Sequence, residues 1–247
     1  MNATVLSSVS VFSPDRSPPL GAFAEGVVIP IDKPLGWTSA DVVRKVKFVL
    51  QRYTGTRKLK VGHAGTLDPL ATGVLLVCTG RATRLAEGLQ ADEKEYVAEM
   101  RLGATTPSFD LETAIDARYP CAHITRAMAE AALRGFVGRQ EQLPPAFSAK
   151  MVEGRRAYEW ARAGRDVAMR LATVTVYDAE LLAFRLPVVT VRIVCSKGTY
   201  IRALARDFGL ALQSGAFLTA LRRTRSGPFN DKESITIEKF LTFFTGI

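Results

Sequence analysis

Short apolar stretches recur along the chain, and their spacing predicts strands in some places and helices in others. Residues 26–34 are mainly apolar and β-branched, which predicts a first strand. Pro30 lies inside it and cannot donate a ladder hydrogen bond, so we expect this strand at a sheet edge. Residues 171–184 and 188–196 alternate with β-branched side chains, which predicts an antiparallel pair joined by a turn at Leu186-Pro187.

Other segments have apolar residues at helical spacing. They are 39–52, 125–137, 154–164, 199–209 and 236–244. The first follows Thr38 and Ser39, either of which is a suitable N-cap, and its polar face is crowded with Arg and Lys. The chain is therefore expected to mix helices with antiparallel strands.

The net charge narrows the class of partner. The chain has 247 residues, a formal net charge of +9 and a pI near 9.7. Such an excess attracts polyanions, which makes nucleic acid the leading partner class, although a moderate excess also simply aids solubility.

Cysteine and histidine are too sparse for several kinds of chemistry. Cys78, Cys121 and Cys195 are odd in number and far apart, which favours neither a disulfide framework nor a zinc site. With His63 and His123 as the only histidines, no cluster has metal-ligand spacing, and no phosphate-binding glycine loop is present. We expect no metal and no cofactor, and a reducing compartment, the cytoplasm.

The termini and apolar runs predict a protein that does not enter a membrane. No apolar run is long enough to cross a bilayer. Residues 1–25 are rich in Ser and Pro and match neither a secretory signal nor a transit peptide. They are expected to form a flexible tail that leads into a single domain over 26–247.

The segment 60–83 is the first candidate for chemistry. Gly62, Gly65 and Gly73 bracket a turn whose one acidic residue is Asp68. The following proline disfavours helix at Asp68, so its carboxylate should project from a turn, in front of a buried strand or helix start at 74–77. An Asx turn, in which Asp68 only bonds its own backbone, is the competing interpretation.

Basic residues gather in further segments. Residues 51–60 lead into the Asp68 turn with positive charge, and 220–228 forms another basic cluster. The block 124–168 has the pattern of an inserted helical subdomain, and its basic residues include Arg155, Arg156 and Arg162. Solvated surface and phosphate contact are both open interpretations of such clusters.

Two more residues have a structural and a functional interpretation. Tyr96 falls in the apolar register of a strand predicted over 95–103, where a tyrosine usually belongs to the core. Arg202 lies in the first turn of the helix predicted at 199–209, where the helix dipole disfavours a cation. A carboxylate or phosphate partner for Arg202 would explain that position.

Several motifs together resemble the TruB family of tRNA pseudouridine-55 synthases. They are Asp32-Lys-Pro-Leu-Gly-Trp-Thr-Ser39, Gly62-His-Ala-Gly-Thr-Leu-Asp-Pro-Leu-Ala-Thr-Gly73, Lys94-Glu-Tyr96, Ser196-Lys-Gly-Thr-Tyr-Ile-Arg202 and Leu221-Arg-Arg223. They occur in the family's order from about residue 26 to residue 229.

The resemblance implies a reaction and residues that perform it. Uridine N1 is detached from its ribose, the base turns, and C5 is joined to the ribose, without a cofactor or metal. The base must first be flipped into a pocket.

The resemblance also implies which residues act. Asp68 matches the catalytic aspartate, which acts as a nucleophile or as a base, and Arg202 matches the arginine that keeps it ionised. Tyr96 matches the tyrosine that stacks on the uracil and helps remove the C5 proton. His63 matches an RNA-contacting histidine, and Tyr200 and Leu221 match residues that line the uracil pocket.

The resemblance also implies a fold and a partner. The fold class is α+β, a pseudouridine synthase catalytic domain with a mixed, mainly antiparallel sheet flanked by helices and an inserted helical thumb at about 124–168. The partner is the T-arm stem-loop of tRNA, bound by a monomer. The chain after Phe229 is too short for the PUA domain that many members carry, so none is expected.

Two other functions compete with this one. A non-catalytic RNA-binding or tRNA-folding protein would need only the basic surfaces. A two-carboxylate glycosidase would need a second acid in a comparable loop, and the sequence offers none.

Overall fold

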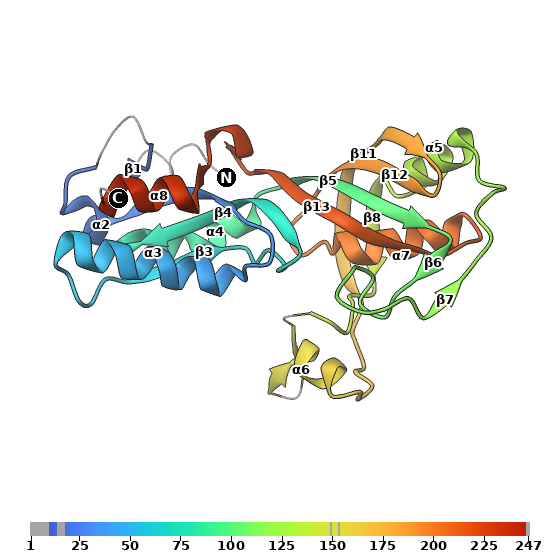
Figure 1. Cartoon of the computed structure of the whole chain (residues 1–247), viewed down its shortest axis with the longest axis horizontal. Coiled ribbons are helices and arrows are strands. Elements are labelled where there is room, and N and C mark those ends of the chain that lie inside the picture. Colours follow the sequence, from blue (N-terminus) through green and yellow to red (C-terminus); the bar gives the residue numbers. More distant parts are fainter. Residues whose placement is uncertain (1–9, 14–17, 149, 153, 246–247) are drawn as a thin grey trace. The chain divides into compact units, whose positions relative to one another are not determined.

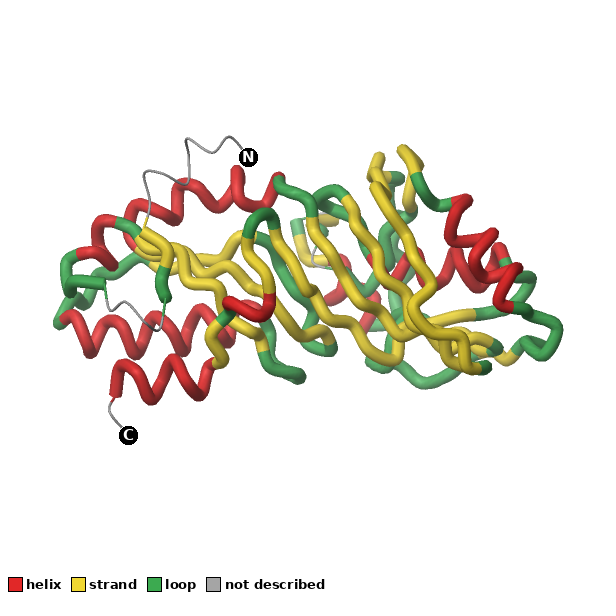
Figure 2. The backbone as a smooth tube through the Cα atoms, turned by 90° about the horizontal axis from the view of Figure 1, so that it is seen from above, coloured by secondary structure: helices red, strands yellow, loops and turns green. Residues whose placement is uncertain are grey.

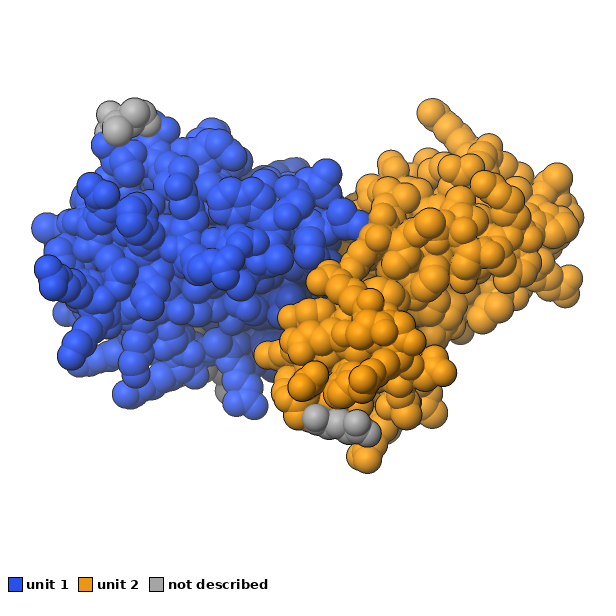
Figure 3. Space-filling view, turned by 60° about the horizontal axis from the view of Figure 1, so that its bottom comes forward, with its two compact units in different colours: residues 1–96, 222–247 blue, residues 97–221 orange. Residues whose placement is uncertain are grey.

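The computed structural model describes residues 10–13, 18–148, 150–152 and 154–245. The chain forms two compact units, residues 1–96 with 222–247 and residues 97–221, coloured separately in Figure 3. Strands β5 (Lys94–Leu102) and β13 (Ala216–Ser226) each begin in one unit and end in the other. The expected fold class is confirmed: helices flank a mixed, mainly antiparallel sheet.

The first unit contains strands from both ends of the chain. Its remaining elements are β1 (Ser10–Val11), α2 (Ala22–Glu25), β2 (Val27–Lys33), α3 (Ser39–Thr54), β3 (Val61–Ala64), β4 (Ala71–Thr79), the 3-10 helix η1 (Gly80–Leu85), α4 (Ala86–Ala91), β14 (Phe229–Asn230), the 3-10 helix η2 (Asp231–Glu233), β15 (Ile235–Thr236) and α8 (Ile237–Thr245). Within this unit β4 pairs with β2, β3 and β13.

Strand β4 is covered on both faces, which explains its continuous apolar run. Leu75 and Val77 pack in one core cluster with residues of α3 and α8, which lie side by side in Figure 1 and Figure 2. Leu76 and Cys78 point to the opposite face and pack against η1 and α4. Residues 74–77 therefore form part of a buried strand, which was one of the two alternatives predicted for them. The other alternative, the start of a helix, is wrong.

Helix α3 begins where its capping residues predict. The Thr38 side chain accepts a hydrogen bond from the Asp41 amide, and the Asp41 carboxylate accepts one from the Thr38 amide. This reciprocal capping box satisfies amides that the first turn leaves without helical partners. Helix α3 thus starts directly after the turn that follows β2.

Strand β2 does not lie at an edge, so the expectation based on Pro30 is wrong. It pairs with β4 on one side and with two short strands on the other. Of these, β1 is paired with Val27 and Val28, and β15 with Ile31 and Asp32. Pro30 falls in the gap between them, where a missing N–H interrupts no ladder bond.

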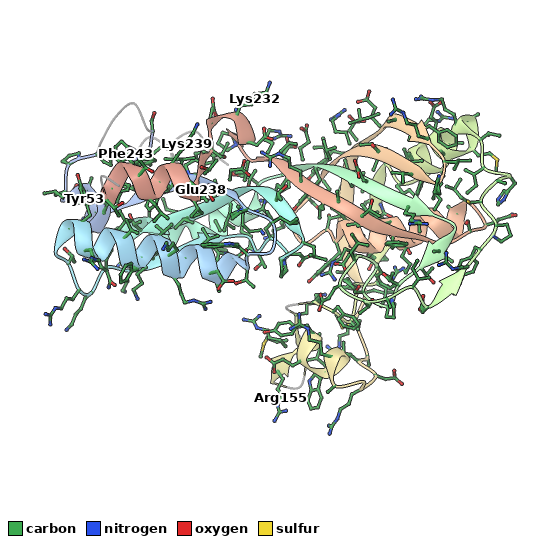
Figure 4. All side chains as sticks on the ribbon, viewed as in Figure 1. Tyr53, Arg155, Lys232, Glu238, Lys239 and Phe243 are labelled. Atoms are coloured by element: carbon green, nitrogen blue, oxygen red, sulfur yellow. The ribbon has the colours of Figure 1, made fainter. Side chains whose placement is uncertain are left out.

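Part of the expected N-terminal tail belongs to the fold. Strand β1 and helix α2 both fall within residues 1–25, and Phe12 is buried. Its ring contacts those of Phe240, Phe243 and Phe244 on α8, with centroid distances of 5.4–6.1 Å. Figure 4 labels Phe243 on α8 and Tyr53 on α3, whose ring also contacts that of Phe244. An aromatic residue in a Ser- and Pro-rich segment was the overlooked signal; residues 1–9 and 14–17 lie outside the described part.

The second unit is built around the predicted hairpin. Its elements are β6 (Ala104–Thr105), β7 (Ala117–Arg118), α5 (Arg126–Gly135), β8 (Gly138–Gln142), β9 (Met151–Val152), β10 (Arg155–Arg156), α6 (Ala157–Arg162), β11 (Ala172–Arg185), β12 (Val188–Cys195) and α7 (Ile201–Ala211). Strands β11 and β12 are antiparallel, as predicted, and the Leu186-Pro187 peptide between them is cis.

The block 124–168 is less uniformly helical than expected. It contains α5 and α6, but β8 lies between them and pairs with β11 in the main sheet. Strand β8 is mostly polar, so no apolar alternation marks it in the sequence. In the described part of the chain, no helix combines the length and apolarity that a membrane crossing requires.

Candidate active site

Asp68 lies in the turn between β3 and β4, as its following proline predicts. Within the turn, the Ala71 amide donates a hydrogen bond to the Asp68 carbonyl at 3.0 Å. Gly65 and Gly73 at its two ends have φ values of 95° and 99°, in a region that favours glycine. The half-buried Asp68 is thus held outside the regular strands.

Side chains from distant parts of the first unit hold the backbone of this turn. The Ser39 hydroxyl donates to the Leu67 carbonyl at 3.0 Å and accepts from the Leu67 amide at 2.9 Å. The Pro69 carbonyl accepts from the Gly36 amide at 2.8 Å and from the Lys33 ammonium at 3.3 Å. Bonds therefore fix the residues immediately before and after Asp68.

Arg223 holds the start of the same turn. Its guanidinium donates to the carbonyls of Gly65 at 3.2 Å and Thr66 at 3.4 Å, and its Nε donates to the Val74 carbonyl at 2.7 Å. Arg223 and Lys33 are 1% and 0% exposed, so two buried cations lie beneath the turn. Burial of a charge is costly, and here backbone carbonyls compensate for part of that cost.

The charges in this unit affect one another. Burial lowers the pKa of Lys33 to about 8, against the opposing effect of the Asp68 carboxylate. The pKa of His63 is lowered mainly by burial and to a smaller extent by the positive charge of the Arg223 guanidinium. His63 is therefore favoured as a neutral ring near pH 7. Its Nδ1 is buried and has no hydrogen-bond partner among the described residues.

Tyr96, at the start of β5, is 9% exposed. Its burial fits the apolar register predicted for this strand, which alternates between buried and more exposed positions. His63, Asp68 and Tyr96 all belong to the first unit.

Arg202 belongs to the second unit, in the first turn of α7, and has a carboxylate partner. Its Nε lies 3.6 Å from Asp110 Oδ2, and its Nη1 donates to the Ser108 carbonyl at 3.2 Å. Both side chains of the ion pair are buried. The Asp110 carboxylate in turn accepts hydrogen bonds from the Ser108 hydroxyl and the Glu112 amide. A partner for Arg202 was predicted, but Asp110 was not identified as that partner.

Tyr200 and Leu221 are the remaining predicted site residues of the second unit. The backbone of Tyr200 exchanges two hydrogen bonds with the Gln142 side chain, at 2.8 and 3.2 Å, which joins the start of α7 to β8. Leu221 is half-buried on β13. Among the described residues, no group of three or more His, Cys, Asp or Glu could hold a metal ion.

The fold is that of a pseudouridine synthase catalytic domain. A solved Cbf5 structure, from a Cbf5-Nop10-Gar1 complex, superposes with a TM-score of 0.69 at 33% identity; the match covers 96% of this chain and 61% of that one. An archaeal Nop10-Cbf5 complex gives 0.65 at 31% identity, with 96% and 60% covered. The chain therefore spans about three fifths of those proteins.

Family models and curated relatives identify the family. The model for the TruB family pseudouridylate synthase N-terminal domain matches residues 51–201, and that for the tRNA pseudouridylate synthase B C-terminal domain matches residues 202–245. The chain belongs to the TruB family of pseudouridylate synthases. It is 56% identical to tRNA pseudouridine synthase B of Phocaeicola vulgatus over 88% of this chain and 93% of the relative, and 47% identical to that of Thermobifida fusca over 90% and 76%.

Sequence reasoning missed the residues that support the turn: Lys33, Ser39 and Arg223. Each belongs to a motif that carried the resemblance, but none had been assigned a role. One signal was available: Lys33 follows Ile31 at the two-residue spacing of a strand, so it falls on the same face as that buried isoleucine, although Asp32 lies between them.

Proposed function

We propose that the chain is a tRNA pseudouridine synthase that isomerises the T-loop uridine at tRNA position 55. The observation that carries this proposal is the Asp68 turn. Asp68, which matches the family's catalytic aspartate, lies in a turn whose backbone is bonded to Lys33, Ser39 and Arg223. Such a fixed carboxylate suits a reaction in which one group must meet a flipped nucleotide in a single geometry.

The reaction rearranges bonds without a net gain or loss of atoms. The bond from uracil N1 to ribose C1′ breaks, the base turns, and C5 forms the new bond to C1′. The proton on C5 is removed and N1 gains a proton, so the product is an isomer. Asp68 acts as nucleophile or as base in this proposal, and no cofactor or metal takes part.

The other predicted residues receive separate roles. Arg202 keeps Asp68 ionised, and Tyr96 stacks on the uracil and assists loss of the C5 proton. Tyr200 and Leu221 line the pocket for the flipped base. His63 contacts the RNA at the position that the flipped uridine leaves. Burial lowers the pKa of His63, which supports the role of a neutral flat ring rather than that of a cation.

The segment around α6 is proposed to grip the T-arm as the family's thumb. Arg155 and Arg165 lie over the Trp160 ring, at 5.2 and 5.1 Å from its centroid. Arg155 is exposed and labelled in Figure 4. Exposed guanidinium groups held on an aromatic ring suit contact with phosphates and bases of RNA. We further propose that the protein acts as a cytoplasmic monomer.

Mass-spectrometric mapping of pseudouridine in a tRNA transcript incubated with the purified chain tests the activity, the substrate and the position together. A matched transcript with cytidine in place of the target uridine is the control. Pseudouridine at the T-loop position alone is the expected result. RNA binding without any pseudouridine would favour the alternative, a non-catalytic tRNA-folding protein.

A further inference from the structure

Arg223 connects the two ends of the Asp68 turn. Its guanidinium bonds to the carbonyls of Gly65 and Thr66, which precede Asp68, and to that of Val74, which follows the turn in β4. One rigid planar group with several fixed donors thus joins backbone atoms on both sides of the carboxylate. Arg223 is among the largest fully buried side chains of the described residues.

The two glycines that flank the turn lie against the same residue. A Cβ atom on Gly73 would lie 2.2 Å from the Arg223 carbonyl oxygen, so the backbone of β13 approaches β4 as closely as only glycine allows. At Gly65 the nearest atom to such a Cβ would be Arg223 Nη1, at 3.8 Å. The backbone of residue 223 therefore requires glycine at position 73, whereas the Arg223 guanidinium lies at an ordinary van der Waals distance from Gly65.

The neighbouring Arg222 has a different kind of environment. Its guanidinium bonds to both carboxylate oxygens of Asp32, at 3.1 and 3.0 Å, and to Asp231 at 2.8 Å. Its side chain is 36% exposed. By contrast, the partners found for Arg223 in the described part of the chain are backbone carbonyls, and no carboxylate pairs with it there. Arg222 consequently provides a matched control on the same strand.

We propose that Arg223 is a positioning residue that sets the geometry of Asp68 for the reaction. It acts through the carbonyls of Gly65, Thr66 and Val74 and does not touch the substrate. Lysine keeps the charge at this position but has a single ammonium, which cannot reproduce a planar fork directed at separated carbonyls. This inference rests on the proposed function.

The test compares Arg223→Lys and Arg223→Gln with Arg222→Lys. Single-turnover rates at saturating tRNA and the Kd for tRNA are measured well below each variant's Tm. Arg223→Lys is expected to lower the rate about 100-fold, the loss that a displacement of about 1 Å causes, with the Kd within about twofold of the wild type. Arg223→Gln should lose more, and Arg222→Lys should stay within about threefold.

A second measurement distinguishes the loss of the guanidinium group from poor folding of these variants. The rate of Arg223→Ala is measured with and without ethylguanidinium, which replaces the missing part of the side chain. At least tenfold recovery of the rate, absent in an Asp68→Asn control, supports the proposal. A wild-type rate in Arg223→Lys would overturn the proposal. Variants that fail to fold even with ethylguanidinium would also overturn it, because Arg223 would then serve the fold as a whole. An inactive wild type would instead refute the proposed function before any variant is compared.

Discussion

The hydroxyl of Ser39 makes two hydrogen bonds to one residue, Leu67, which directly precedes Asp68. Ser39 is the first residue of helix α3, so these bonds attach the Asp68 turn to the start of a long, well-capped helix. Both groups of Leu67 are buried, and the hydroxyl satisfies a donor and an acceptor at once.

Replacing Ser39 by Ala should therefore destabilise the protein. A buried amide and a buried carbonyl lose their partner, and each unsatisfied group costs about 1–3 kcal/mol. Urea unfolding measures the change in the free energy of unfolding. Thr56→Ala is the control, because that hydroxyl makes only an exposed bond of 3.4 Å. Equal stability of the two variants would show that the Ser39–Leu67 bonds do not matter.

The lowered pKa of Lys33 predicts a pH-dependent stability. Burial lowers it to about 8 in the folded protein from 10.5, so between these values the unfolded chain binds the extra proton. Stability from this group is therefore greatest above pH 10.5, decreases as the pH falls, and is fully lost once the pH has fallen through 8. The slope should be about 1.4 kcal/mol per pH unit.

The test subtracts the unfolding free energy of Lys33→Met from that of the wild type at each pH. This difference should be constant below about pH 8 and should rise toward pH 10.5. Lys239→Met, which changes an exposed lysine on α8, serves as the control and should give a flat difference. A flat difference for Lys33→Met as well would contradict a buried, shifted lysine.

The proposed thumb predicts a change in the salt dependence of RNA binding. Arg155→Ala should weaken tRNA binding and reduce the slope of log Kd against log salt by about 1, because one phosphate contact is lost. Arg162→Ala should change the slope less, since the Arg162 guanidinium already bonds to Glu112 at 2.7 and 2.9 Å. An unchanged slope in Arg155→Ala would mean that this arginine is simply solvated.

The sequence predicted elements well where burial produces a simple pattern. Strands β11 and β12 alternate, and α3 has both a cap and an apolar face. Strand β13 was missed because Arg222, Arg223 and Arg225 give it the composition of an exposed basic cluster. Two of these arginines have partners within the first unit instead: the partly exposed Arg222 pairs with carboxylates, and Arg223 is buried against carbonyls.

The candidate site was predicted only in part, for a related reason. Glycines and an Asp-Pro pair within a few residues of one another revealed the Asp68 turn. Its supports come from positions 28 to 158 residues away in the chain, so no local pattern connects them. A lysine or arginine also usually indicates surface, and only the fold shows that Lys33, at the end of β2, and Arg223, within β13, are buried.

The most direct test of the central claim is to map pseudouridine by mass spectrometry in a tRNA transcript treated with wild-type protein or with Asp68→Asn. The substitution keeps the size of the side chain and removes its charge. We expect pseudouridine at the T-loop position with the wild type and none with Asp68→Asn, while the Kd for tRNA changes less than about threefold. Pseudouridine formation by Asp68→Asn at the wild-type rate would contradict the assignment of Asp68 as the catalytic group.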